Sequence, residues 1–72
     1  MNDIKKLVGK NVRRLRKDME LSQEELGFEA GLDRTYVSGV ERGTRNPTVT
    51  VLAKLALALK IDPEKLLSKK NK

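Results

Sequence analysis

The sequence predicts an all-α fold, a compact bundle of five helices. Two observations carry this prediction. Apolar residues recur at the three- and four-residue spacing of amphipathic helices along most of the chain, and two short helical patterns meet at one glycine, Gly31. The length of 72 residues gives room for one small hydrophobic core, so we expect residues 1–72 to form a single domain.

The first predicted helix covers about residues 3–17. Its apolar side is formed by residues that recur at helical spacing: Ile4, Leu7 or Val8, Val12 and Leu15. Basic residues surround that side: Lys5, Lys6, Lys10, Arg13, Arg14, Arg16 and Lys17. Such residues form a solvated face or contact phosphate groups, and the pattern alone leaves both interpretations open.

A second helix is predicted over about residues 23–30. Ser22 is a good N-cap, and Glu25 stands three residues later, which is the capping-box spacing. Gly31 can end this helix in the left-handed backbone conformation, which costs other residues about 1–2 kcal/mol. Gly27 is small enough to let this helix cross its neighbour closely.

Asp33 suits the N-cap of the next helix, which is expected over about residues 34–42 and completes a helix-turn-helix. At about 100° per residue, Val37 and Val40 fall on one side of it. The other side carries polar or small residues: Arg34, Thr35, Ser38, Gly39 and Arg42. One face of this helix therefore packs, and the other points outward.

A loop over residues 43–47 leads to a fourth predicted helix, which Thr48 can cap. Its inward stripe consists of Leu52, Leu55, Ala56 and Leu59. A second apolar stripe lies on a face that the first does not cover, and it consists of Val49, Ala53 and Leu57. Apolar surface beyond what a monomer can bury indicates a partner.

Asp62 and Pro63 predict a short fifth helix, because they are cap and first-turn signals. That helix carries two more leucines. We therefore predict a homodimer formed by the region of about residues 49–67, with these interface residues: Val49, Ala53, Leu57, Leu66 and Leu67.

The composition limits the classes of function. Lys and Arg outnumber Asp and Glu by 16 to 10, and the net charge of +6 favours an anionic partner. The sequence has no Cys and no His, which excludes disulfides, zinc fingers and His-based catalysis. We expect no cofactor, no metal ion and no enzymatic activity. No stretch approaches the ~20 apolar residues of a membrane span, so we expect a cytoplasmic protein that does not enter a membrane.

A resemblance to the helix-turn-helix of the Cro and phage-repressor family, also called the XRE family, lies in the run LSQEELGFEAGLDRTYVSGVERGTRNPT. It extends from about Leu7 to Leu67, and it is strongest to the controller proteins of restriction–modification systems. The resemblance implies a sequence-specific DNA-binding transcriptional regulator, a repressor or activator, that acts as a homodimer on a two-fold operator. It also implies an ion pair between Arg16 and Glu41, and the family usually has glycine where this chain has Glu20.

Contacts with double-stranded DNA follow from side-chain chemistry and from the resemblance together. Arg34 lies in the first turn of the helix that enters the major groove in this family, and its guanidinium can donate two hydrogen bonds to guanine. Thr35 and Ser38 share that face and are either base contacts or solvated residues. The candidates for contact with the DNA backbone are Gln23, Tyr36, Arg42, Arg45 and Asn46, of which Tyr36 also suits the edge of the core.

Glu24 and Glu25 give the second predicted helix an acidic side that does not favour DNA. In phage repressors an acidic patch on this helix can touch RNA polymerase, so the resemblance makes these two residues candidates for a polymerase contact. The alternative is a solubilising face.

An antitoxin of a toxin–antitoxin pair that also represses its own promoter is a different function on the same fold. Such antitoxins commonly carry an extra segment that embraces the toxin, and this chain stops shortly after its fifth predicted helix. A hydrolytic enzyme is a third reading. The sequence disfavours it, because no nucleophile has a histidine and no cluster of metal ligands is apparent.

Overall fold

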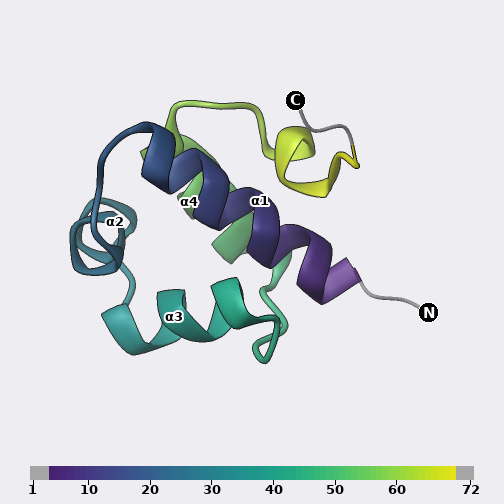
Figure 1. The fold of residues 1–72 in the computed structure, drawn as a ribbon, viewed down its shortest axis with the longest axis horizontal. Helices are drawn as coiled ribbons and strands as arrows, with labels where there is room; N and C mark the ends of the chain where they lie inside the picture. Colours follow the sequence, from purple (N-terminus) through teal and green to yellow (C-terminus); the bar gives the residue numbers. More distant parts are fainter. Residues whose placement is uncertain (1–3, 70–72) are drawn as a thin grey trace.

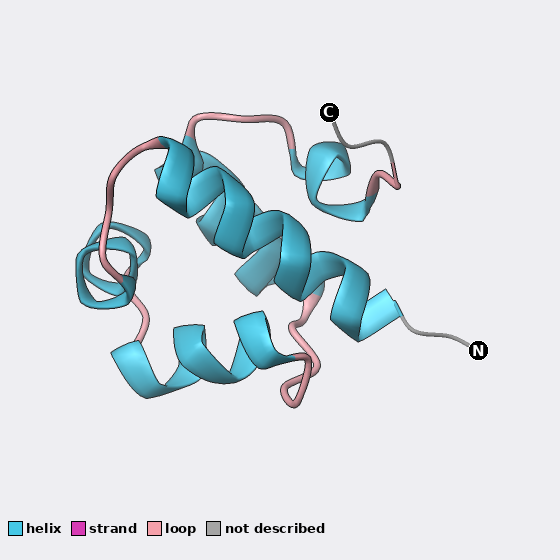
Figure 2. Ribbon diagram, in the orientation of Figure 1, coloured by secondary structure: helices cyan, strands magenta, loops and turns pink. Residues whose placement is uncertain are grey.

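The computed structural model describes residues 4–69, which form four α-helices followed by a short 3₁₀ helix (Figure 1 and Figure 2). These elements are α1 (Ile4–Asp18), α2 (Gln23–Ala30), α3 (Arg34–Arg42), α4 (Val49–Leu59) and η1 (Pro63–Leu67). Loops connect them, and the described residues contain no strand. The prediction of an all-α fold with a helix-turn-helix is therefore confirmed. The expected start of the first helix at residue 3 lies outside the described residues.

The prediction of five α-helices is wrong in its last element, because η1 is a 3₁₀ helix of five residues. Its hydrogen bonds join residues three apart. The Lys65 N–H donates to the Asp62 carbonyl at 3.0 Å, and the Ser68 N–H donates to the Lys65 carbonyl at 3.4 Å. The Asp62 side chain makes no capping hydrogen bond. A segment this short gains too few four-residue hydrogen bonds to form a stable α-helix.

Local signals set the ends of α2 as the sequence predicted. The Ser22 hydroxyl accepts a hydrogen bond from the Glu25 N–H at 2.9 Å, and the Glu25 carboxylate accepts one from the Ser22 N–H at 2.8 Å. Gly31 ends the helix with a φ of 71°, in the left-handed region. Asp33 stands at the N-cap of α3, but its side chain makes no capping hydrogen bond, so the predicted side-chain cap is absent.

The core lies between all five elements, because α1, α2, α3, α4 and η1 each contribute buried apolar residues to it. In Figure 1, α1 crosses in front of α4, α3 lies below both, and η1 lies on the other side of α1. The largest fully buried side chains are Leu26, Leu55, Leu66, Val12, Val37 and Val40. The inward stripe of α4 is confirmed, with Leu55, Ala56 and Leu59 buried and Leu52 half-buried. The packed side of α3 is confirmed as well.

Leu66 is the clearest departure from the predicted dimer interface. Its side chain is fully buried in the core of the monomer, so it is not available to a partner. Asn11, a buried polar residue of α1, holds this end of the chain in place. Its side-chain nitrogen donates hydrogen bonds to the carbonyl oxygens of Leu66 and Ser68, each at 2.9 Å. These bonds satisfy an amide that would otherwise be buried without a partner.

The turn between α1 and α2 contains Glu20 in the left-handed conformation, with a φ of 60°. This conformation explains the glycine that is usual in the family at this position. It costs a non-glycine residue about 1–2 kcal/mol, whereas glycine loses about 0.5–1 kcal/mol more conformational entropy on folding. We expect Glu20→Gly to raise the free energy of unfolding by about 0.5–1 kcal/mol, measured by urea denaturation.

Glu20→Gln is the matched control, because it removes the charge and keeps a side chain on the left-handed backbone. It should leave the free energy of unfolding within about 0.5 kcal/mol of the wild-type value. If Glu20→Gln stabilises the protein as much as Glu20→Gly does, charge and not backbone conformation is responsible.

Candidate nucleic-acid interface

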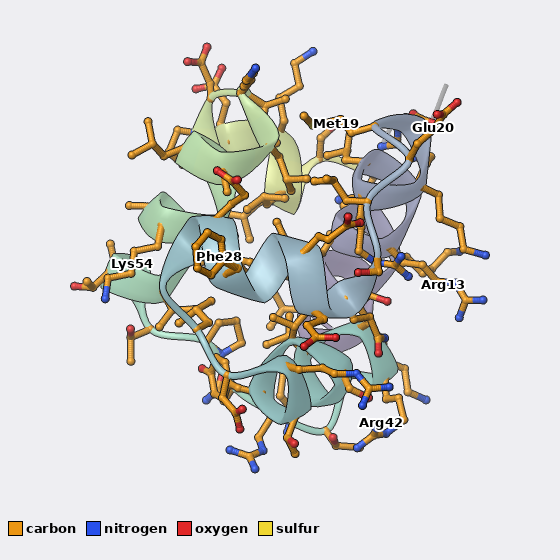
Figure 3. All side chains as sticks on the ribbon, turned by 90° about the vertical axis from the view of Figure 1, so that its left-hand side faces the viewer. Arg13, Met19, Glu20, Phe28, Arg42 and Lys54 are labelled. Carbon is orange, nitrogen blue, oxygen red and sulfur yellow. The ribbon has the colours of Figure 1, made fainter. Side chains whose placement is uncertain are left out.

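The outward face of α3 is a compact polar surface. Arg34 and Thr35 are exposed in its first turn, Ser38 is half-buried one turn later, and Arg42 is exposed at the end. The Arg42 guanidinium donates a hydrogen bond to the Ser38 hydroxyl. Figure 3 shows Arg42 at the lower edge of the molecule, directed away from the core. The structure therefore brings the predicted base-reading residues together on one exposed face.

An ion pair between α1 and α3 fixes the position of that face. The Arg16 Nε donates to Glu41 Oε2 at 2.6 Å, and its Nη2 donates to Glu41 Oε1 at 3.0 Å. The Arg16 Nη1 donates to the Leu21 carbonyl at 2.7 Å. These hydrogen bonds to Glu41 raise the pKa of Arg16, while burial acts in the opposite direction. The pair that the family resemblance implied is present.

Gln23 joins the same network. Its side-chain nitrogen donates to Glu41 Oε1 at 3.1 Å, so the first residue of α2 is tied to α3. Gln23 is half-buried, and Asn46, in the loop after α3, is exposed. Both residues were predicted to contact the DNA backbone, and both lie at helix ends or loops that border α3.

Two glycines let the helices approach closely. A Cβ on Gly9 would lie 2.4 Å from the Val40 carbonyl oxygen, so α1 lies directly against the backbone of α3. A Cβ on Gly27 would lie 2.6 Å from the Leu32 carbonyl oxygen, so this glycine lets the turn between α2 and α3 lie close against α2. Sequence reasoning missed Gly9. Its signal was a glycine in the middle of a helical pattern, where glycine is otherwise unfavourable.

Gly39 is buried and does not form part of the open face to which the sequence assigned it. A Cβ at this position would lie 2.4 Å from Cγ of Arg45, so the missing side chain makes room for the stem of Arg45. The Arg45 guanidinium carbon lies 5.3 Å from the centroid of the Tyr36 ring, a cation–π distance. Arg45 is thus laid along α3 instead of extending freely from the loop, and Tyr36 is half-buried beneath it.

The exposed side of α2 is acidic and carries one aromatic ring. Glu24, Glu25 and Glu29 are exposed, and Phe28 is 84% exposed beside them. Together with Leu21 they line a hollow of about 410 Å³. Figure 3 shows Phe28 directed outward from α2. The sequence left the position of Phe28 undecided.

The second apolar stripe of α4 is exposed as predicted. Val49 is 82% exposed, Leu57 is 80% exposed, and Ala53 lies between them on the same exposed side. Leu67, in η1, is 44% exposed. Four of the five residues predicted for a dimer interface are therefore on the surface of the monomer, and Leu66 is not.

Residues 4–69 contain no group of His, Cys, Asp or Glu side chains placed to hold a metal ion. Within the same residues, none of the helices has the length and apolar character needed to cross a membrane.

Comparison with known proteins identifies the family. The HTH_3 helix-turn-helix family matches residues 12–66. The chain is 45% identical over 67 residues to the control protein C.BamHI of Bacillus amyloliquefaciens, a match that covers 92% of this chain and 83% of that protein. It is also similar to the crystal structure of the restriction-modification controller protein C.AhdI from Aeromonas hydrophila. That match has a TM-score of 0.84 and 50% identity, and it covers 86% of this chain and 94% of the other.

A third similarity is to a structure solved with DNA. SinR, the master regulator for biofilm formation, was crystallised in complex with DNA and matches with a TM-score of 0.81 and 31% identity. The match covers 85% of this chain and 98% of SinR. The residues matched by the family run from the middle of α1 through the helix-turn-helix and α4 into η1. The chain therefore belongs to the HTH_3 (XRE) family of helix-turn-helix transcriptional regulators.

Proposed function

We propose that this protein is a sequence-specific DNA-binding regulator that works as a homodimer and serves as the controller of a restriction–modification system. The observation that carries the proposal is the outward face of α3, where Arg34, Thr35 and Ser38 project from a helix packed firmly against α1. The similarity to C.BamHI and C.AhdI supports the controller role. The complex of SinR with DNA supports duplex DNA as the partner.

Arg34 reads a base at the end of α3 that enters the major groove. Because its guanidinium is exposed and unpaired among residues 4–69, it is free to donate two parallel hydrogen bonds to guanine. Thr35 offers a methyl group and a hydroxyl from the same turn. The Ser38 hydroxyl, which accepts a hydrogen bond from Arg42, reads a neighbouring base pair or shifts that bond to the DNA.

Contacts with phosphate groups fix the register of α3 in the groove. Gln23 presents the N-terminus of α2 to a phosphate, where unpaired N–H groups favour an anion. Arg45, held over Tyr36, reaches the backbone beside α3, and the exposed Arg42 and Asn46 add contacts on either side. None of these contacts involves a chemical step, so the regulator acts by occupying its promoter.

Dimerisation uses the exposed stripe of α4, with Val49, Ala53 and Leu57, and the exposed Leu67 of η1. A two-fold axis at this stripe places the stripes of the two monomers against each other, so that both are removed from water. It also presents two copies of α3 to one side of a duplex. Half-sites are then expected about 34–36 Å apart, one turn of the double helix.

The acidic side of α2 is proposed to contact RNA polymerase. Glu24 and Glu25 are exposed in the first turn of α2, and Phe28 adds an exposed apolar group beside them. Such a patch is complementary to a partner surface that is basic and contains an apolar pocket. Transcription in vitro with Glu24→Gln and Glu25→Gln tests this contact, because activation should fall while operator binding is kept.

Selection of duplexes from a random pool, followed by binding measurements with Arg34 variants, tests the proposed function. The protein should prefer selected over random duplexes at physiological salt, with affinity falling steeply as salt rises. Arg34→Ala should cost about 1–3 kcal/mol on the selected site and relax the preference at one base pair. Equal affinity of the wild type for selected and random duplexes would refute sequence-specific binding.

Arg34→Lys is the matched control for charge. Lysine keeps the positive charge but lacks the planar fork that matches guanine. We expect it to retain the salt dependence of binding and to lose most of the discrimination at that base pair. If Arg34→Lys discriminates as well as the wild type, Arg34 contacts phosphate instead of a base.

A further inference from the structure

The outer face of α1 carries a row of cations that the proposed operator contacts leave unused. Lys10, Arg13, Arg14 and Lys17 are exposed on this face, and Lys69, which follows η1, lies beside them. We name these five residues the basic strip. They border a hollow of about 470 Å³ whose floor includes Leu7 and Asn11.

The charges of the basic strip are not neutralised within the described chain. Within residues 4–69, the cations of the strip form no ion pair with a carboxylate, and the ion pair of α1 is the buried one between Arg16 and Glu41. The acidic residue of α1 is Asp18, at its C-terminal end. Cations gathered this closely repel one another, and an anionic partner relieves that repulsion.

Asn11 positions two residues of the basic strip in addition to stabilising the fold. Its side-chain nitrogen donates to the Leu66 and Ser68 carbonyls, each at 2.9 Å, and so holds the segment that carries Lys69 against α1. Its side-chain oxygen accepts a hydrogen bond from the Arg14 guanidinium at 3.4 Å. The strip is thus partly ordered before any ligand arrives, which lowers the entropy lost on binding.

The basic strip lies on a different side of the molecule from both surfaces of the proposed operator complex. Figure 3 shows Arg13 extending to one side, Lys54 of α4 to the opposite side, and Arg42 of α3 toward the lower edge. Dimerisation through the exposed stripe of α4 would therefore leave the strip uncovered. Arg42, which marks the C-terminal end of α3, lies below Arg13 in this view, so the strip and α3 occupy different parts of the surface.

The spacing of the strip fits a chain of phosphates better than a single anion. Lys10 and Lys17 are seven residues apart, which is about 10 Å along a helix that rises 1.5 Å per residue. Each strand of a duplex carries a charge about every 3.4 Å along the axis, so several phosphates can face the strip. With one Tyr and one Phe in the whole sequence, the strip has no stacking platform for single-stranded bases.

We propose that the basic strip binds the sugar–phosphate backbone of a second DNA duplex, so that the regulator bridges its operator to another DNA segment. This inference rests on the proposed function, because the first duplex is the operator held by α3. Binding through the strip depends on charge and not on sequence. Each protomer of a dimer contributes one strip.

A two-step capture experiment tests the bridge. An operator duplex that contains one binding site is fixed to beads, and the protein is bound to it. Unbound protein is washed away, and the amount of protein retained on the beads is measured. A labelled duplex of unrelated sequence is then added. The wild type should capture it, and raising the salt should release it before the operator. The variant Arg13→Gln with Lys17→Gln should reduce capture at least about tenfold and leave operator retention within about threefold of wild type.

The control variant carries Lys5→Gln with Lys6→Gln, which removes the same charge from exposed residues at the start of α1, outside both the strip and the proposed dimer interface. It should capture the labelled duplex like the wild type, and thermal melting of both variants checks that they fold.

The proposed bridge would be overturned if the wild type captured no labelled duplex, or if the strip variant captured as much of it as the wild type does. An equal loss of retention and capture in the strip variant would also overturn it, because the strip would then contact the operator itself. Failure at the retention step, with no preference for operator over a scrambled duplex, overturns the proposed function and the bridge with it.

Discussion

Replacing Arg16 with Met is expected to lower the free energy of unfolding by about 3–5 kcal/mol, because it strands a buried carboxylate. The side chain of Glu41 is 2% exposed, and both of its oxygens accept hydrogen bonds from Arg16. The Leu21 carbonyl loses its donor as well. Since a small domain has about 5–15 kcal/mol of stability in total, this variant should be close to unfolding at room temperature. Urea denaturation followed by circular dichroism measures the loss.

A double-mutant cycle separates the pair from its surroundings. Glu41→Leu removes the carboxylate, and the double variant with Arg16→Met places two apolar side chains at the same site. We expect the double variant to be more stable than the sum of the single losses predicts, by about 0.5–3 kcal/mol. Arg13→Met, on the exposed side of the same helix, is the control and should change stability by no more than about 0.5 kcal/mol. A coupling of zero would mean that the two residues do not pair in solution.

The raised pKa of Arg16 determines how its contribution to the free energy of unfolding should depend on pH. Hydrogen bonds to Glu41 raise this pKa above its ordinary value. A cation with a raised pKa in the folded state contributes stability that is fully present below its unfolded pKa and is lost only as the pH rises through its folded pKa. Arginine stays charged far above neutral pH, so the stability difference caused by Arg16 ionisation should be constant from about pH 6 to pH 9.

The helix-turn-helix could be predicted because its signals are local. The capping box of Ser22 and Glu25 and the left-handed Gly31 act within one helical turn, and the structure contains both. The spacing of Val37 and Val40 likewise specified which side of α3 is buried. Physical rules that connect residues three or four apart need no knowledge of the rest of the chain.

Features that depend on distant contacts could not be predicted in this way. Leu66 matches the pattern of a surface leucine in a short helix, but its side chain packs in the core, and its carbonyl accepts a hydrogen bond from Asn11, 55 residues earlier. Gly39 falls on the outer side of α3 by its angle, but the returning loop lays Arg45 across it. Neither contact can be predicted from a single sequence, because each joins elements whose relative position is determined by tertiary packing.

The candidate DNA contacts could be predicted only in part. The exposed side of α3 follows from its periodicity, and the structure brings Arg34, Thr35 and Ser38 to one surface. The position of that surface on the molecule depends on the Arg16–Glu41 pair and on the approach of α1 at Gly9. The family resemblance supplied the first of these supports, and sequence reasoning supplied neither Gly9 nor the placement of Arg45.

Changes in the exposed stripe of α4 have the largest expected effect on binding, because the proposed dimer would make two copies of α3 act together. Leu57 is 80% exposed in the monomer, so changing it should leave the folded monomer intact. In a two-fold dimer each change occurs twice across the interface, and the burial of one Leu side chain contributes about 1.5–3 kcal/mol. A loss of about 3 kcal/mol corresponds to a dissociation constant more than about 100-fold weaker.

Leu57→Glu is therefore expected to yield a folded monomer whose affinity for a two-half-site operator is at least about 100-fold below that of the wild type. Sedimentation measures the oligomeric state, and binding to operators with one and two half-sites measures the cooperation between recognition helices. Phe28→Glu is the matched control, since it makes the same chemical change at an 84% exposed residue on another side of the molecule (Figure 3). It should remain dimeric and bind normally. Should the wild type be monomeric at tens of micromolar while Leu57→Glu binds the operator as tightly, α4 does not form the interface, and the two-fold arrangement of half-sites must be abandoned.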